Sequence, residues 1–278
     1  MSGQTKKILC AVSHANQDPW IDIWKDGQFV TWQKWQDSEN FTIINFFGRK
    51  PSLFTRTFDY LHEKIRWSNK YIAKSLMIIE SLLLRPLILL EPKLKRDFNF
   101  TGEHSVYKVN FIDSFLTYRW KILSLIQFFL EETEFDFLYV TSSSSYIRPN
   151  VLLEFTSTLP GDRVYLGPLP YDGADFVSGS SRLISRDVAQ LLWDHRREFQ
   201  IALIEDKAMA QLLLTLGVYP SFLGLVNITS VREAEDLRVN DFRGVYHFRL
   251  KSLVNGTRID ADVMKALHSK FRDEFTNA

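Results

Sequence analysis

Two short stretches of the sequence carry charged side chains whose spacing could do chemistry. An acidic pair, Glu205-Asp206, opens the pattern "EDKAMAQLLLTLG". A carboxylate there could take a proton from a hydroxyl group, although the helix dipole alone also favours acids at a helix N-terminus. The stretch "YHFRLK" places His247, Arg249 and Lys251 at alternate positions, so that in a strand all three face one side. These cations suit the stabilisation of a leaving anion, or else they form the solvated face of an edge strand.

A third stretch, "FDFLYVTSSSSYIRPN", places four serines directly after an apolar strand pattern. Serine runs are typical of flexible linkers, but a nearly continuous apolar run predicts a strand that is covered on both faces. Open α/β sheets bind their ligands at the carboxyl ends of such strands. We therefore predict that Ser142, Ser143 and Ser144 lie at a binding edge, where their hydroxyl groups donate hydrogen bonds to phosphate or sugar oxygens.

The elements that must position these residues alternate along the chain. Strand patterns occur at 7–15, 41–48, 106–111, 135–141, 163–169 and 174–185, and helical patterns at 114–132, 151–159, 185–199 and 205–217. This alternation predicts an α/β fold in which helices flank a mostly parallel central sheet, with residues 1–278 forming a single domain. Between the first two strands lie Trp20, Trp24, Trp32 and Trp35, which either pack against the sheet or form an aromatic platform for a sugar or base.

In their order and spacing, these stretches resemble one family of enzymes. "NFIDSFLTYRWK" at 110–121, the strand that ends in serines, the Ser178-Gly179 step, and "ED" followed by Leu216-Gly217 are similar to motifs of the β-1,3-glycosyltransferase group that includes Fringe. The resemblance covers residues 103 to 220, together with "IINFFG" at 43–48. It implies a GT-A-like, Rossmann-related fold. It also implies an inverting, hexosyltransferase-like reaction that moves a sugar from a nucleotide-diphosphate sugar, with UDP expected, to a hydroxyl group of a glycan acceptor.

The resemblance also implies roles for single residues. It matches Asp206 to the general base of the family and makes Glu205 a neighbour that orients the base or touches donor or acceptor. The other expected donor contacts come from Asp113, Lys121, His14, Ser178 and Gly179, and the expected acceptor contacts come from Asp172 and Asp175. A glycine at 179 permits close backbone approach to a ligand. A plain salt bridge between Asp113 and Lys121 and a structural role for His14 stay open as alternatives.

The serine run is also where this chain departs from the family. There the corresponding strand ends in aspartates that hold a divalent cation, and a neutral hydroxyl is a poor ligand beside a carboxylate. We therefore expect no metal and no other cofactor. Lys121 and the cluster of His247, Arg249 and Lys251 would instead stabilise the diphosphate. Two alternatives remain: an inactive GT-A-like protein that binds glycans or acts as a scaffold, and a transferase whose metal site uses Glu205 and His247.

Composition narrows the class of partner and the compartment. The net charge is +1 for 278 residues, so no overall field attracts nucleic acid. The single cysteine, Cys10, cannot form an internal disulfide, and neither a signal peptide nor a spanning segment is evident. These features favour a cytoplasmic enzyme of surface polysaccharide or glycan biosynthesis.

Residues 49–97 differ from the rest of the chain. They carry eleven lysines and arginines against five acids, together with many apolar residues in a helical pattern. This predicts a basic, apolar helical insertion that either packs on the domain or lies on the cytoplasmic face of an anionic membrane, near a lipid-linked acceptor. Its most apolar part, 72–92, contains Lys74, Glu80 and Arg85, and we do not predict a transmembrane span there.

Overall fold

A central β-sheet organises the chain. The computed structural model describes residues 6–35, 39–53, 94–96, 105–114, 117–200 and 203–276, with a few residues between 56 and 75. The strands are β1 (Ile8–His14), β2 (Phe41–Arg49), β3 (Leu94–Arg96), β4 (Ser105–Ile112), β5 (Phe137–Ser142), β7 (Tyr165–Pro168), β8 (Ser181–Ser185) and β9 (Ser221–Leu223). Their order in the sheet is β3-β4-β2-β1-β5-β8-β7-β9.

Parallel pairing runs through the middle of this sheet. β4, β2, β1 and β5 pair in parallel, as do β7 and β9, whereas β3 with β4, and β8 with both β5 and β7, pair antiparallel. The predicted α/β fold with a mostly parallel central sheet flanked by helices is confirmed.

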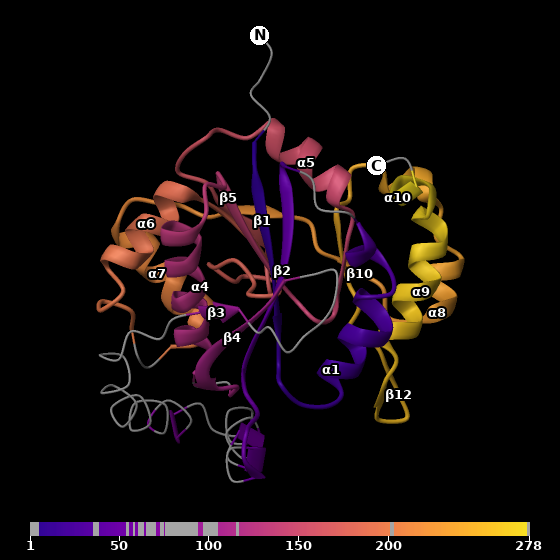
Figure 1. Cartoon of the computed structure of the whole chain (residues 1–278), viewed down its shortest axis with the longest axis horizontal. Coiled ribbons are helices and arrows are strands. Elements are labelled where there is room, and N and C mark those ends of the chain that lie inside the picture. The colour runs from indigo at the N-terminus through magenta and orange to yellow at the C-terminus, as the bar shows by residue number, and fades with distance from the viewer. Residues whose placement is uncertain are drawn as a thin grey trace.

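Helices cover both faces of the sheet (Figure 1). One face is covered by α4 (Tyr118–Glu132), α6 (Arg186–Asp194) and α7 (Glu205–Thr215). The other face is covered by α1 (Trp20–Ile23), α5 (Pro149–Ser157), α8 (Val231–Glu235), α9 (Asp260–Phe271) and α10 (Asp273–Thr276). The described residues also include a π-helical turn (Trp24–Gln28) and two 3-10 turns (Trp32–Lys34 and Val239–Phe242).

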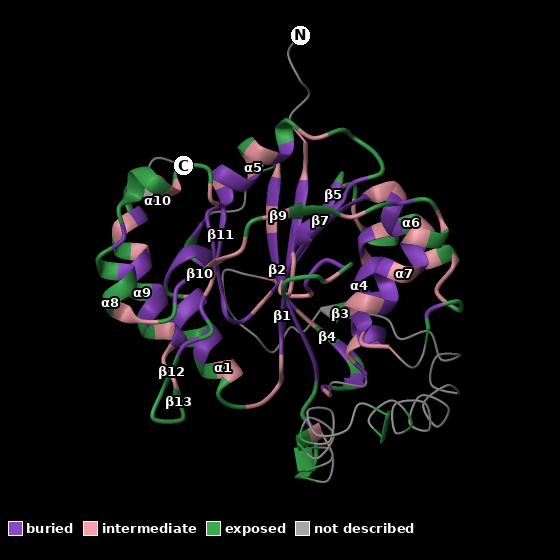
Figure 2. Cartoon of the chain, turned by 180° about the vertical axis from the view of Figure 1, so that it is seen from behind, coloured by how far each residue is buried: buried purple, intermediate pink, exposed green. Residues whose placement is uncertain are grey.

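The apolar runs of the central strands supply both cores. In β1, Leu9 and Ala11 face the α4 side, while Ile8, Cys10 and Val12 face the other side. Figure 2 shows these central strands as buried along their length. Because successive side chains of a strand point to opposite faces, only a continuous apolar run can fill two cores at once.

A smaller sheet adjoins the carboxyl end of β5. Its strands are β6 (Ser145–Ile147), β11 (His247–Arg249) and β10 (Val226–Asn227), and a hairpin of β12 (Leu253–Val254) and β13 (Thr257–Arg258) follows β11. The late stretch "YHFRLK" therefore packs beside the serine run, because β11 pairs antiparallel with β6.

Several expected elements have different bounds in the structure. The strand predicted at 174–185 begins only at Ser181, because residues 178–181 form a turn in which the Ser181 amide donates to the carbonyl of Ser178 at 3.3 Å. The helix predicted at 185–199 ends at Asp194. Trp24, Trp32 and Trp35 are buried, which favours the packing interpretation of the tryptophans, and Trp20 is half-buried.

Most of the segment at 49–97, predicted to be a basic helical insertion, lies outside the described residues. Within the ranges that are described, no helix combines the length and the apolar composition that crossing a bilayer requires.

Candidate active site

The strand order defines one special edge of the sheet. From β1 the chain proceeds to β2 and β4 on one side of β1, and it then returns through α4 to β5 on the other side. The order therefore reverses between β1 and β5, and such a switch point opens a crevice at the carboxyl ends of the strands. β1 ends there at His14 and β5 at Ser142, and Asp113 directly follows β4.

A pocket with a volume of about 670 Å³ lies at this edge. All of the site residues expected from the sequence line it except His247, Asp172 and Asp175. The structure thus brings together residues from the first strand, the serine run, the Ser178-Gly179 step, the start of α7 and the end of β11.

The serine run is a tight, hydrogen-bonded turn rather than a linker. β5 ends at Ser142 and β6 begins at Ser145. The side-chain amide of Gln28 donates to the carbonyls of Ser142 and Ser145 at 2.9 and 3.0 Å, and the indole N–H of Trp32 donates to the same Ser145 carbonyl at 3.0 Å. These donors from the segment after β1 fix the turn against the sheet.

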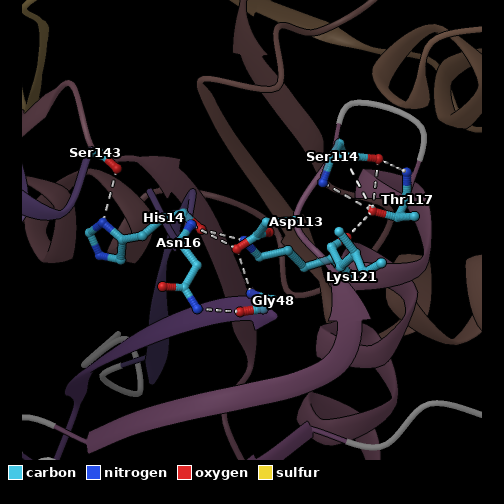
Figure 3. A network of polar contacts seen from close by, with 9 residues as sticks. His14, Asn16, Gly48, Asp113, Ser114, Thr117, Lys121 and Ser143 are labelled. Carbon is cyan, nitrogen blue, oxygen red and sulfur yellow. Dashed lines mark hydrogen bonds and ion pairs between the residues drawn. The ribbon is translucent and has the colours of Figure 1, made fainter. Parts of the chain in front are cut away.

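His14 contacts the serine turn from the end of β1. Its Nδ1 lies 2.9 Å from Ser143 Oγ (Figure 3). Its Nε2 lies 2.7 Å from Asn45 Oδ1. Burial lowers the pKa of His14 to about 3, and the ammonium group of Lys121 contributes in the same direction. The imidazole is therefore neutral at physiological pH.

Asp113 and Lys121 form a buried ion pair below the pocket, the alternative that the sequence left open. Lys121 Nζ donates to Asp113 Oδ1 at 2.7 Å and also to the carbonyl of His14. The other carboxylate oxygen accepts from the amides of Asn16 at 2.9 Å and Gly48 at 2.7 Å (Figure 3). A Cβ atom at Gly48 would lie 2.7 Å from Asp113 Cγ, so this position requires glycine. The pair joins the ends of β1, β2 and β4 and sets the shape of the pocket floor.

The two adjacent acids at the start of α7 lie in different environments. Glu205 is buried, and its Oε1 lies 2.8 Å from Nη1 of the buried Arg182. Burial raises the pKa of Glu205, and Arg182 partly offsets that effect. Asp206 is half-buried and accepts from the amides of Gly179 at 3.2 Å and Lys207 at 2.9 Å. Both carboxylates line the pocket, and Asp206 is the more exposed of the two.

Cations line the opposite side of the pocket, next to the serine turn. Arg249, Lys251 and Arg258 all contribute to this lining. Arg258 Nη2 donates to Ser144 Oγ at 2.7 Å, and its guanidinium group lies 4.7 Å from the centre of the Trp20 ring. Burial lowers the pKa of Arg249, and the nearby charge of Arg258 lowers it further.

Three expected residues lie outside the pocket lining. His247 is buried below the turn, where its Nε2 lies 3.1 Å from Ser145 Oγ, and burial lowers its pKa to about 3. His247 therefore supports the serine turn without lining the pocket, whereas Arg249 and Lys251 line it. Asp172 and Asp175 are exposed, and the roles expected for them in acceptor binding stay predictions.

Sequence reasoning missed several residues of the lining, among them Asp59, Tyr118 and Arg258. Burial raises the pKa of the Tyr118 phenol to about 12. Arg258 has no motif around it, and only the return of the chain through the β12–β13 hairpin brings it to Ser144. Trp20 belongs to the tryptophan cluster that the sequence did mark.

The residues at the serine turn do not fit the divalent cation that the resembled family holds there. Ser143 is hydrogen-bonded to His14, and Ser144 accepts from the cationic Arg258. Among the described residues, no group of three His, Cys, Asp or Glu side chains could hold a metal ion. Glu205 and His247, the alternative ligands, contact Arg182 and Ser145 respectively.

Comparisons with known proteins give distant structural neighbours. No protein-family model matches the chain, and no curated protein sequence matches it. A glycosyltransferase involved in the glycosylation of the major capsid of PBCV-1 shares 10% identity, with 93% of this chain and 98% of that chain covered and a TM-score of 0.45. The apo-form of the glycosyltransferase GlyE of Streptococcus pneumoniae TIGR4 shares 11% identity, with 98% of this chain and 64% of that chain covered and a TM-score of 0.45. Another GlyE structure shares 10% identity, with 99% of this chain and 64% of that chain covered and a TM-score of 0.44. The chain thus spans less than two thirds of the GlyE chains.

Proposed function

We propose that the chain is an inverting glycosyltransferase that uses a nucleotide-diphosphate sugar, with UDP as the expected nucleotide, and needs no metal ion. The observation that carries this proposal is the distribution of charge in one pocket. Asp206 belongs to α7, whereas Arg249, Lys251 and Arg258 come from β11 and the hairpin that follows it, and all four line the pocket. Figure 1 shows α7 and β12 on opposite sides of the molecule. The pattern of motifs from 103 to 220 supports the same reaction.

The cationic side suits the diphosphate of the donor. Guanidinium groups donate paired, charge-assisted hydrogen bonds to phosphate oxygens. As the bond from the anomeric carbon to the diphosphate breaks, negative charge grows on the leaving oxygen. Fixed cations beside that oxygen stabilise the transition state more than the ground state. Arg258 is held in place by an ion pair with the buried Asp260, by Ser144 and by the Trp20 ring. No described residue accepts from its Nη1 group, which remains to donate to a phosphate oxygen.

The carboxylate side suits the acceptor. In the proposed step, Asp206 removes the proton of an acceptor hydroxyl while the oxygen of that group attacks the anomeric carbon. The attack comes from the face opposite the leaving diphosphate, so the anomeric configuration inverts. Glu205 is a positioning residue: its ion pair with Arg182 lies beneath the start of α7 and keeps Asp206 directed at the pocket.

A glycan-binding or scaffold protein without activity is the rival proposal, since the serines replace acids of the resembled family. The half-buried Asp206 on the pocket wall favours the enzyme, because mere glycan binding needs no such base.

We place the reaction in the cytoplasm, in polysaccharide or glycan biosynthesis, and segment 49–97 would bring the enzyme to a membrane that carries lipid-linked acceptor. Sedimentation with anionic vesicles tests this last part, and absence of binding would contradict it.

A thermal-shift screen of nucleotides and nucleotide sugars tests the proposal. Specific binding raises the apparent melting temperature by mass action. We expect UDP and UDP-sugars to raise it equally with manganese and with EDTA. A rise that depends on manganese would contradict the metal-free donor site, and the absence of a shift with every nucleotide would remove the proposed function.

A further inference from the structure

A chain of hydrogen bonds beneath the pocket fixes the direction of each donor and acceptor. It begins at Trp24, whose indole N–H can only donate, and which donates to Gln33 Oε1 at 3.1 Å. The amide nitrogen of Gln33 therefore faces the other way and donates to Asn45 Oδ1 at 2.9 Å. The indole N–H of Trp24 thus determines which atom of the Gln33 and Asn45 side-chain amides is the oxygen and which is the nitrogen.

The same chain fixes the tautomer of His14. Its Nε2 lies 2.7 Å from Asn45 Oδ1, which can only accept, so Nε2 carries the ring proton. The ring is fully buried and neutral, because burial lowers its pKa to about 3. Nδ1 is therefore unprotonated and accepts from Ser143 Oγ at 2.9 Å (Figure 3). The hydroxyl proton of Ser143 is therefore taken by His14 and is not available to a ligand.

Ser144 has the opposite hydrogen-bond polarity. Its Oγ accepts from Arg258 Nη2 at 2.7 Å, since a guanidinium group can only donate. No acceptor among the described residues takes the Ser144 hydroxyl proton, so that proton is available to a ligand. Two neighbouring serines of one turn thus present unlike groups to the same pocket: lone pairs at Ser143 and a proton at Ser144.

We propose that Ser143 is a specificity-determining residue that accepts a hydrogen bond from a hydroxyl group of the donor, while Ser144 donates to an anionic oxygen of the diphosphate. The inference rests on the proposed function and deepens it. It also revises the expectation that these serines act alike as donors. A phosphate oxygen at Ser143 would bring two sets of lone pairs together, whereas a hydroxyl group of the ribose or of the transferred sugar supplies the missing proton.

Calorimetric titration of two matched variants tests the inference. Ser143→Ala and Ser144→Ala change neighbouring residues of the same turn, and the probes are inorganic pyrophosphate, UDP, 3′-deoxy-UDP, 2′-deoxy-UDP and UDP-glucose. Ser143→Ala should weaken binding of a hydroxyl-bearing probe about five- to tenfold and leave pyrophosphate binding unchanged. Ser144→Ala should weaken pyrophosphate and UDP alike. Unchanged pyrophosphate binding also shows that the Ser143→Ala protein is folded.

The deoxy probes identify the source of the hydroxyl group. If Ser143→Ala weakens the binding of UDP but not that of one deoxy analogue, the hydroxyl group missing from that analogue is the partner of Ser143. If the variant weakens the binding of UDP-glucose alone, the partner of Ser143 is a hydroxyl group of the sugar. Equal weakening of pyrophosphate by both variants would overturn the inference and leave the proposed function standing. Failure of every nucleotide probe to bind the wild-type protein would overturn the proposed function itself.

The hydrogen-bond polarity has its own measurement, which needs no ligand. The ¹⁵N chemical shifts of the His14 ring in the full chain should show, at pH 7, a neutral imidazole that is protonated at Nε2 and unprotonated at Nδ1. A ring protonated at Nδ1, or an imidazolium at that pH, would reverse the polarity of Ser143 and overturn the inference whatever the binding data show.

Discussion

The two sides of the pocket differ in how their charge is balanced. On the side formed by α7 and the turn before β8, Arg182 neutralises Glu205 in the protein interior, and Asp206 remains at the pocket wall. On the side formed by the serine turn, β11 and the β12–β13 hairpin, the positive charges of Arg249 and Arg258 lie close enough together for one to lower the pKa of the other. One side holds a charge pair that needs no ligand. On the other side Arg258 pairs with the buried Asp260, but Arg249 and Lys251 add positive charge that an anion would relieve, and this contrast gives a bound donor a direction.

The strongest test of the carboxylate side is Asp206→Asn. The amide keeps the shape of the carboxyl group but cannot take a proton, so we expect transfer to fall about 100- to 10,000-fold while nucleotide affinity stays within twofold. Initial rates in EDTA and titration with UDP measure the two quantities. Asp194→Asn, an exposed acid at the end of α6, is the matched control. Full activity in Asp206→Asn would remove the proposed mechanism.

Arg182→Met tests whether the ion pair is part of the structure rather than of the ligand site. Removing the guanidinium leaves the Glu205 carboxylate buried and unpaired, which we expect to cost about 3–5 kcal/mol of unfolding free energy at pH 8. The folded-state pKa of Glu205 then rises further above its unfolded value, so the loss should shrink as pH falls and the carboxyl group protonates. Urea unfolding at pH 8 and pH 5 measures both effects.

The double variant Arg182→Met with Glu205→Gln is the control for that experiment. It removes both charges together and should recover most of the lost stability, because no uncompensated charge remains. If the double variant is as unstable as Arg182→Met alone, the cost comes from packing and the ion-pair interpretation is wrong.

Arg258→Gln tests the cationic side. Removal of one charge-assisted hydrogen bond donor should weaken binding of UDP about 10- to 100-fold. Because Arg258 also pairs with the buried Asp260, the variant should lose thermal stability as well, and binding is measured below its melting temperature. Arg232→Gln, at a side chain that is 91% exposed on α8, is the matched control and should change neither quantity. Equal affinity in Arg258→Gln and the wild-type protein would assign the diphosphate to another part of the pocket.

The smallest predicted effect is on the pH dependence of stability. His14 and His247 have pKa values lowered to about 3 in the folded protein, against about 6.5 in the unfolded chain. Between these values the unfolded state binds more protons, so stability should fall as pH drops from 6.5 towards 3. His247→Gln should reduce that slope by up to about 1.4 kcal/mol per pH unit. Unfolding curves across this range measure it, and an unchanged slope would contradict the neutral, buried state of His247.

Local patterns predicted much of the framework. The apolar run before the serines identified β5 as a strand covered on both faces, and the acidic pair identified the start of α7. Both features depend on neighbours along the chain, through side-chain alternation in one case and helix periodicity in the other. Pairings between distant segments have no such signal. The contact of Arg258 with Ser144 joins positions 114 residues apart, and that of Arg182 with Glu205 crosses from a strand to a helix.

The sequence by itself determined which residue types stand at the carboxyl ends of the strands, because strand periodicity and chain order are local properties. Only the tertiary structure decided what those residues do to one another. It set Glu205 against Arg182 and left Asp206 on the pocket wall, and it gave Ser143 and Ser144 opposite hydrogen-bond polarity. The physical reason is that charge balance and proton direction depend on partners from other elements, and burial makes those partners obligatory.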